Sequence, residues 1–93
     1  MNTTHTDVSR YEAKHLPLRA VVFCEHYGDH SAFVVIGLEY DIAAQGRTRE
    51  EAIERFEATL IAEEEVCKEV GKTWPQDIPA SPQWFHDMWD RCT

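Results

Sequence analysis

The chain has 93 residues, and its 17 Asp and Glu against nine Lys and Arg give a formal net charge of −8. A chain of this length forms one hydrophobic core and encloses little volume for a deep substrate cleft. Because binding to a nucleic-acid backbone depends on Lys and Arg, the acidic balance disfavours DNA or RNA as a direct ligand. Neither a signal peptide nor an apolar run of about 18 residues is evident, so we expect a cytoplasmic protein with no membrane span.

Two apolar runs separated by a turn signal predict a β-hairpin. The runs cover 18–27 and 32–38 and are rich in β-branched and aromatic residues, with Gly, Asp and Ser at 28–31 between them. A shorter segment at 39–45 predicts a third strand in meander order. Residues 1–15 are polar, and we expect them to be flexible.

Apolar residues occupy both faces of the first two predicted strands. In the first of them, Ala20 and Val22 alternate with Val21 and Phe23. An antiparallel sheet with one wet face alternates apolar and polar residues instead. A second layer must therefore cover the other face, supplied either by the C-terminal segment or by another protomer. On this pattern we expect a homodimer or a higher homo-oligomer.

A capping motif predicts a long helix at 48–70. Thr48 and Glu51 have the S/T-x-x-E spacing in which each side chain satisfies an unpaired backbone N–H, and Gly71 is placed to end the helix in a left-handed conformation. The apolar stripe expected to pack on the sheet consists of Ile53, Phe56, Leu60, Cys67 and Val70, flanked by Ala52 and Val66.

Prolines in the segment 72–81 predict an extended connector. Ser81 and Pro82 then have the pattern of an N-cap followed by proline, which predicts a short helix at 82–91. This region is rich in aromatic residues, which either pack within the fold or a dimer, or anchor a different protein. The candidate anchors are Trp74, Trp84 and Trp89.

The segment 37–53, which reads GLEYDIAAQGRTREEAI, resembles the HicB-like antitoxin family. The resemblance covers about residues 19–70 and is most specific in the Gln-Gly-x-Thr-x-x-Glu-Ala core at 45–52. It implies an α+β fold of β-β-β-α order in a single HicB-like domain at 16–93, with Gly46 permitting the turn into the helix. HicB proteins neutralise a small HicA ribonuclease toxin, and many carry a C-terminal DNA-binding domain, which we expect this stand-alone domain to lack.

The resemblance and the charge together favour a non-catalytic, antitoxin-like domain that covers the RNA-binding surface of a small basic ribonuclease. The expected acidic contacts are Glu54, Glu57, Glu64 and Glu65. Two alternatives remain open. One is a phage or mobile-element inhibitor of the anti-CRISPR type that mimics nucleic acid in order to block a nuclease complex. The other is a homo-oligomeric scaffold domain.

No catalytic residue, metal site or cofactor is predicted, and we expect no enzyme activity. His26 and His30 are separated by a turn instead of lying on one helical face, as a zinc pair would. Glu39 and Asp41 lack a third carboxylate to complete a cation site. The three cysteines, Cys24, Cys67 and Cys92, are odd in number and widely spaced, which predicts reduced and mostly buried thiols.

Overall fold

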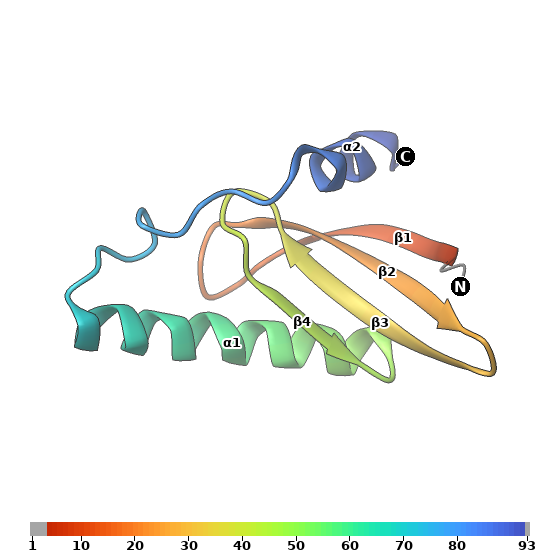
Figure 1. The fold of residues 1–93 in the computed structure, drawn as a ribbon, viewed down its shortest axis with the longest axis horizontal. Coiled ribbons are helices and arrows are strands. Elements are labelled where there is room, and N and C mark those ends of the chain that lie inside the picture. The colour runs from red at the N-terminus through yellow and green to blue at the C-terminus, as the bar shows by residue number, and fades with distance from the viewer. Residues whose placement is uncertain (1–3, 93) are drawn as a thin grey trace.

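The computed structural model describes residues 4–92 as a four-stranded sheet between two helices (Figure 1). The sheet is an antiparallel meander in the order β1-β2-β3-β4, with α1 on one face and α2 on the other. The element bounds are β1 (Thr4–Glu12), β2 (Arg19–Tyr27), β3 (His30–Gly37), β4 (Ala43–Gly46), α1 (Arg49–Val70) and α2 (Gln83–Arg91). The predicted α+β class is confirmed, whereas the predicted number of three strands is wrong.

The additional strand is β1, so the prediction of a flexible segment over 1–15 is wrong for residues 4–12; residues 1–3 lie outside the described residues. β1 pairs with β2 in two stretches that are separated by an irregularity at Asp7, which has a φ of 53°. An edge strand gains its backbone hydrogen bonds from one neighbour and needs few buried side chains. The polar sequence of β1 therefore lacks the apolar run by which a strand is recognised.

Alternate residues of β2 and β3 face α1 and form a cluster that we call the inner cluster. Its buried members are Leu18, Ala20, Val22, Val35, Ile42, Ala52, Phe56 and Leu60. The helix reaches this position because Gly46 lets its first turn approach β4 closely. A Cβ at Gly46 would lie 2.6 Å from the backbone nitrogen of Ala52. The glycine thus serves close packing, where the sequence pattern had indicated only a turn.

Both predicted ends of α1 are confirmed. The Thr48 hydroxyl accepts a hydrogen bond from the Glu51 backbone nitrogen at 3.1 Å, and Gly71 adopts a left-handed conformation with a φ of 75°. The Glu51 carboxylate accepts from the backbone nitrogen of Arg47 and not from that of Thr48. No helix within residues 4–92 is long and apolar enough to cross a membrane.

The second half of α1 extends past the sheet and packs against the connector instead (Figure 1). Trp74 and Ile78 of the connector pack against the inner cluster, and Cys67 is buried. Val70, which was predicted to belong to the packed stripe, is 61% exposed, and Val66, which was predicted to flank it, is 49% exposed. The connector leaves this side of the helix uncovered, so the stripe is narrower than its sequence pattern indicates.

The other face of the sheet is covered by α2 from the same chain. The buried members of this outer cluster are Val21, Phe23, Ile36, Leu38 and Met88. Phe85 of α2 stacks on Phe23, with ring centroids 6.2 Å apart and planes 17° from parallel. Because the chain itself supplies the second layer, the two-sided apolar pattern no longer requires another protomer.

Ser81 does not cap α2 as predicted. Its hydroxyl is buried and donates a hydrogen bond to the carbonyl of Gly37, while its backbone nitrogen donates to the carbonyl of Leu38 at 3.0 Å. Pro82 takes the N-cap position without a side-chain hydrogen bond. The end of β3 thus holds the connector at the point from which α2 starts.

The predicted third strand at 39–45 is displaced to β4 because the chain bends after β3. The Glu39 carboxylate accepts hydrogen bonds from the backbone nitrogen of Arg19, at 2.9 Å, and from its Nε. Gly37 in turn donates its backbone N–H to the carbonyl of Ile42 at 2.9 Å. These contacts form a loop over 38–42, and regular pairing with β3 begins only at Ala43.

Removal of the Met88 side chain tests the role of α2 as a cover. We expect Met88→Ala to lower the free energy of unfolding by about 2 kcal/mol, because it creates a cavity between α2 and the sheet. Asp90→Ala, an exposed change on the same helix, should leave stability within about 0.5 kcal/mol. Chemical denaturation followed by circular dichroism measures both, and equal stabilities would show that α2 does not pack on the sheet.

Candidate functional site

The four predicted acidic contacts on α1 divide into two pairs with different surroundings. Glu57 is half-buried and is engaged within the chain. Its carboxylate accepts hydrogen bonds from the Tyr11 hydroxyl, from the backbone nitrogen of Lys14 at 2.7 Å and from that of His15 at 3.0 Å. Glu64 lies 3.0 Å from Nε2 of the same His15. These two glutamates hold residues 13–18, the β1–β2 connection, against α1.

The surroundings of Glu57 change the pKa of both partners in its hydrogen bond with Tyr11. Burial raises the pKa of the Glu57 carboxyl, but the hydrogen bonds from Tyr11, Lys14 and His15 outweigh it and leave the pKa below its ordinary value. Burial, followed by the hydrogen bond to Glu57, raises the pKa of Tyr11 to about 12. The pair therefore holds one proton, on the tyrosine, throughout the neutral range.

Glu54 and Glu65 lie on the side of α1 opposite to the buried Phe56 and point away from the sheet. Both are exposed, and neither makes a hydrogen bond or ion pair within residues 4–92. Steps of four residues add Glu50 and Glu69, which are also exposed and lack such a partner in the same part of the chain. We call these four carboxylates the acidic row. At a rise of about 1.5 Å per residue, the row is about 28 Å long.

The middle of the acidic row is apolar. Ile61 is 49% exposed, and the neighbouring Ala58 and Ala62 are exposed as well. The outward face of α1 thus has carboxylates at both ends and a small apolar area between them. A charged border around a modest apolar centre is the general arrangement of protein-binding surfaces.

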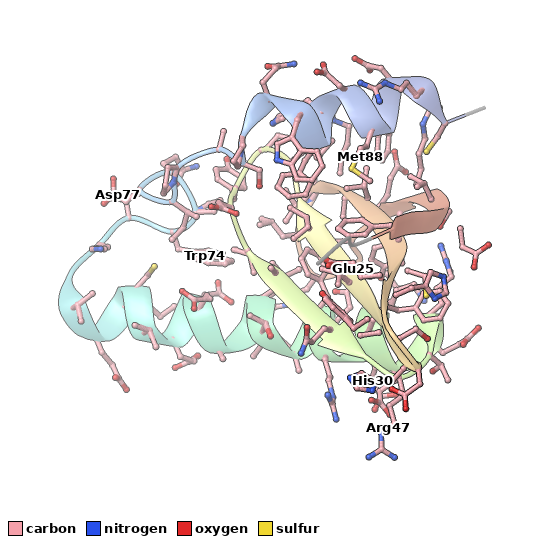
Figure 2. All side chains as sticks on the ribbon, turned by 45° about the vertical axis from the view of Figure 1, so that its right-hand side comes forward. Glu25, His30, Arg47, Trp74, Asp77 and Met88 are labelled. Carbon is pink, nitrogen blue, oxygen red and sulfur yellow. The ribbon has the colours of Figure 1, made fainter. Side chains whose placement is uncertain are left out.

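The predicted tryptophan anchors lie in three different surroundings. Trp74 is half-buried between the connector and α1 (Figure 2). Trp89 packs against the outer cluster, with the guanidinium carbons of Arg10 and Arg19 at 5.0 and 5.3 Å from its ring centroid. Trp84 is 48% exposed, and its ring centroid lies 4.4 Å from that of Phe85.

Two of these three tryptophans therefore serve the fold. The Arg10 Nε also donates a hydrogen bond to the Trp89 carbonyl at 2.9 Å. Arg10 therefore contacts both the ring and the backbone of Trp89 and so holds α2 in place. Such cation–π contacts are worth about 0.5–1 kcal/mol at exposed positions. Trp84 alone has the exposure that an anchor for another protein needs.

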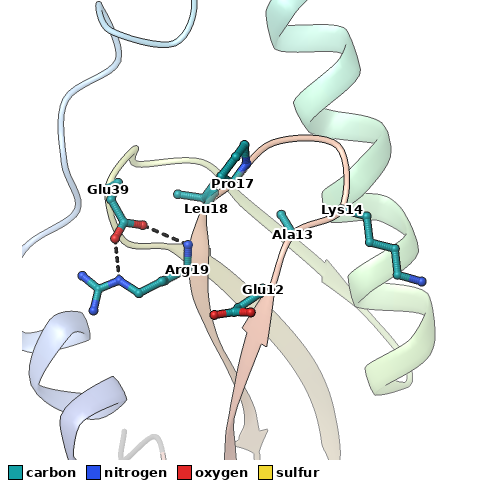
Figure 3. A pocket seen from close by; sticks show the side chains of 7 residues that line it. All are labelled: Glu12, Ala13, Lys14, Pro17, Leu18, Arg19 and Glu39. Atoms are coloured by element: carbon teal, nitrogen blue, oxygen red, sulfur yellow. Dashed lines mark hydrogen bonds and ion pairs between the residues drawn. The ribbon is translucent and has the colours of Figure 1, made fainter.

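An open cleft of about 510 Å³ lies between the β1–β2 connection and the loop that follows β3 (Figure 3). It is lined by Glu12, Ala13, Lys14, Pro17, Leu18, Arg19 and Glu39. Arg19 and Glu39 neutralise each other across its floor, with hydrogen bonds from the backbone nitrogen and the Nε of Arg19. Burial raises the pKa of Glu39, and the bonds from Arg19 lower it to a net value below the ordinary one. The side chains of this cleft form no nucleophile–base pair.

The hairpin tip and the cysteines contain no reactive arrangement within the described part of the chain. His30 Nδ1 lies 3.0 Å from Asp29, and both side chains are largely exposed. No three His, Cys, Asp or Glu side chains among the described residues are grouped so as to hold a metal ion. Cys24 and Cys67 are buried free thiols, as predicted, and Cys92 is partly buried.

No protein-family model, curated protein or solved structure matches this chain. The geometry of its own surface is therefore the basis for assigning a function. Within residues 4–92, the outward face of α1 presents four exposed carboxylates that bond to no other side chain.

The role of Glu57 in holding the β1–β2 connection can be measured by its pH dependence. The pKa of Glu57 is lower in the folded state than its ordinary value of 4.5. The ionised carboxylate therefore stabilises the fold fully above pH 4.5, and this stabilisation is lost as the pH falls through the pKa of the folded state. We expect Glu57→Gln to cost about 1 kcal/mol at pH 7 and progressively less below pH 4.5.

Glu54→Gln is the matched control, because Glu54 is exposed and engages no other described residue. Its unfolding curve should follow that of the unmodified chain at every pH. Denaturant titrations at several pH values between neutral and acid measure the difference. If the loss of unfolding free energy in Glu57→Gln were the same at every pH, the role assigned to this carboxylate would be contradicted.

Proposed function

We propose that this chain is a non-catalytic, antitoxin-like protein-binding domain whose acidic row covers the RNA-binding surface of a small basic ribonuclease. The observation that supports the proposal most directly is the acidic row itself. Its carboxylates project from one rigid helix and are engaged by no other group within residues 4–92.

Only Glu50 of the row lies in the first turn of α1, where the helix dipole stabilises a carboxylate. The other three carboxylates of the row have no such support. Glu50 with Glu54, and Glu65 with Glu69, are like-charge pairs at i,i+4, and such pairs destabilise a helix by a few tenths of a kcal/mol each. The other acidic side chains of α1 show that the fold can use carboxylates, since Glu57 and Glu64 contact the β1–β2 connection and Glu51 lies 3.4 Å from Arg55. The unused carboxylates are best explained by a partner of positive charge.

A ribonuclease must present Lys and Arg to the phosphates of its RNA substrate. An acidic surface on a rigid helix can occupy those cations and exclude the RNA without any chemical step. The net charge of −8 also accelerates the encounter with a basic protein through long-range attraction. The exposed Ile61 between the two ends of the row then supplies an apolar contact at the centre of the interface.

The support for α1 makes this surface suitable for binding. The inner cluster holds one side of the helix, and Glu57 and Glu64 hold its flank through the β1–β2 connection. A surface that is already ordered loses little conformational entropy when a partner binds. The resemblance of residues 45–52 to the HicB-like family agrees with this role and supplies the class of partner in the proposal.

A double charge reversal on the row tests the proposal. Tagged protein is used to isolate a small basic ribonuclease from host lysate, and inhibition of its RNA cleavage is then titrated with purified proteins. We expect Glu54→Lys combined with Glu65→Lys to weaken inhibition by at least about a hundredfold, since each reversal replaces attraction with repulsion at the interface. Thermal stability should not fall, because neither carboxylate has a partner among the described residues.

The control has the same change in net charge at positions away from α1. Asp29→Lys combined with Asp90→Lys alters two exposed residues, at the hairpin tip and on α2. This variant should inhibit almost as well as the unmodified chain, with only a slower association rate. Equal inhibition by both double variants, or capture of no ribonuclease at all, would refute the proposed function.

A further inference from the structure

The sheet has two edges, and their backbone groups are unequally protected. β4 forms one edge and has only four residues. In an antiparallel pair, successive residues direct their backbone N–H and C=O groups alternately toward and away from the partner strand. Because the Ile42 carbonyl accepts from Gly37 of β3, the backbone groups of Ala43 and Gln45 point away from β3. Arg55 Nη1 donates to the outward carbonyl of Gln45 at 3.2 Å. A short strand with a capped carbonyl is a poor template for another strand.

The β1 edge is longer and more open. Its N-terminal part contains the irregularity at Asp7, which disturbs pairing there. From Ser9 to Glu12 the register with β2 is regular, and Ala13 donates its N–H to the carbonyl of Leu18 at 2.9 Å. Since the backbone groups of Ala13 face β2, those of Tyr11 and Ser9 face β2 as well. The backbone groups of Arg10 and Glu12 therefore point away from the sheet. Among the described residues only Arg49 bonds to them, its Nη2 donating to the Arg10 carbonyl at 3.5 Å. That carbonyl oxygen has a second lone pair that can accept from another strand.

The side chains along this stretch are complementary to themselves. Arg10 and Glu12 are two residues apart, so both project from the same face of the sheet, with Tyr11 projecting from the other. If a second copy of β1 pairs antiparallel about Tyr11, each Arg10 lies opposite the Glu12 of the partner. The backbone groups of the same two residues then form about four hydrogen bonds in two symmetric pairs.

The surroundings of Arg10 and Glu12 leave room for this pairing. A hollow of about 420 Å³, of high exposure to solvent, is lined by Arg10, Tyr11, Glu12 and Trp89. Glu12 is exposed and makes no ion pair within residues 4–92. Arg10 is held by Trp89 through its Nε, which fixes the direction of its side chain. One member of the cross-strand pair is thus positioned in advance, and the other is free to meet it.

We propose that β1 pairs with β1 of a second copy of this chain, about a two-fold axis at Tyr11, and joins two sheets into one continuous sheet. The interface is isologous, because the same short segment supplies both halves of the contact. It involves no residue of the acidic row, so it is independent of the proposed function. Its small extent implies a weak dimer that forms as concentration rises.

Sedimentation velocity of the full chain over a wide concentration range, with charge-reversed variants, tests the proposal. Arg10→Glu and Glu12→Arg each replace two attractive pairs by two repulsive ones, and each should weaken dimerisation on the order of tenfold. The double variant R10E/E12R restores opposite charges across the axis, and we expect it to recover dimerisation. The double variant still lacks the Arg10 contact with Trp89. If it dimerises again, the weaker dimerisation of Arg10→Glu was caused by the lost cross-strand pair and not by the lost contact with Trp89.

Arg47→Glu is the matched control, since it reverses an exposed arginine that directly follows β4, the strand at the opposite edge of the sheet from β1. It should dimerise as the unmodified chain does, and circular dichroism should show all variants folded. In hydrogen exchange, the amides of Arg10 and Glu12 should become protected as concentration rises, and that of Ala43 should not. A chain that stays monomeric at every concentration, or a dimer indifferent to the single reversals or not recovered by the double variant, overturns the proposal.

Discussion

The β2–β3 hairpin imposes the main constraint on this structure, because both of its faces are apolar. A sheet with such a hairpin at its centre has to be covered twice, and the chain meets this need with two helices of very different length. α1 buries Phe56 and Leu60 on one face, and α2 buries Met88 on the other. Several contacts serve to hold α2 over the sheet. Ser81 bonds to the end of β3 just before α2 begins, and the guanidinium groups of Arg10 and Arg19 lie over the Trp89 ring.

The sequence predicts those parts of the fold that local chemistry determines. Thr48 and Gly71 mark the ends of α1 because a helix terminus needs a side-chain acceptor at its start and a left-handed residue after its end. The hairpin is predictable from its two apolar runs and the turn signal between them. β1 is not, because an edge strand is defined by its pairing with β2 and its own side chains are polar. The hydrogen bond of the Ser81 hydroxyl is not predictable from sequence either, since its acceptor, the Gly37 carbonyl, is 44 residues away.

The candidate site shows the same division between local pattern and tertiary contact. Sequence identifies α1 as acidic, but composition does not distinguish Glu57 from Glu54. The structure separates them because Tyr11 and the β1–β2 connection lie on only one flank of the helix. Among the tryptophans, Trp89 is engaged by two arginines from neighbouring strands, a contact that no sequence spacing indicates. The residues that remain available to a partner are thus those that long-range contacts leave unused.

The two apolar clusters also differ in when they can form during synthesis. Every buried residue of the inner cluster lies between Leu18 and Leu60, so these residues can pack together once α1 has emerged from the ribosome. The outer cluster depends on Met88, which leaves the ribosome almost 30 residues after Leu60. During that interval Val21, Phe23, Ile36 and Leu38 form an uncovered apolar surface on an otherwise folded sheet, the kind of surface that chaperones bind. α2 therefore removes this apolar surface from solvent, and it does so later than α1 covers the other face of the sheet.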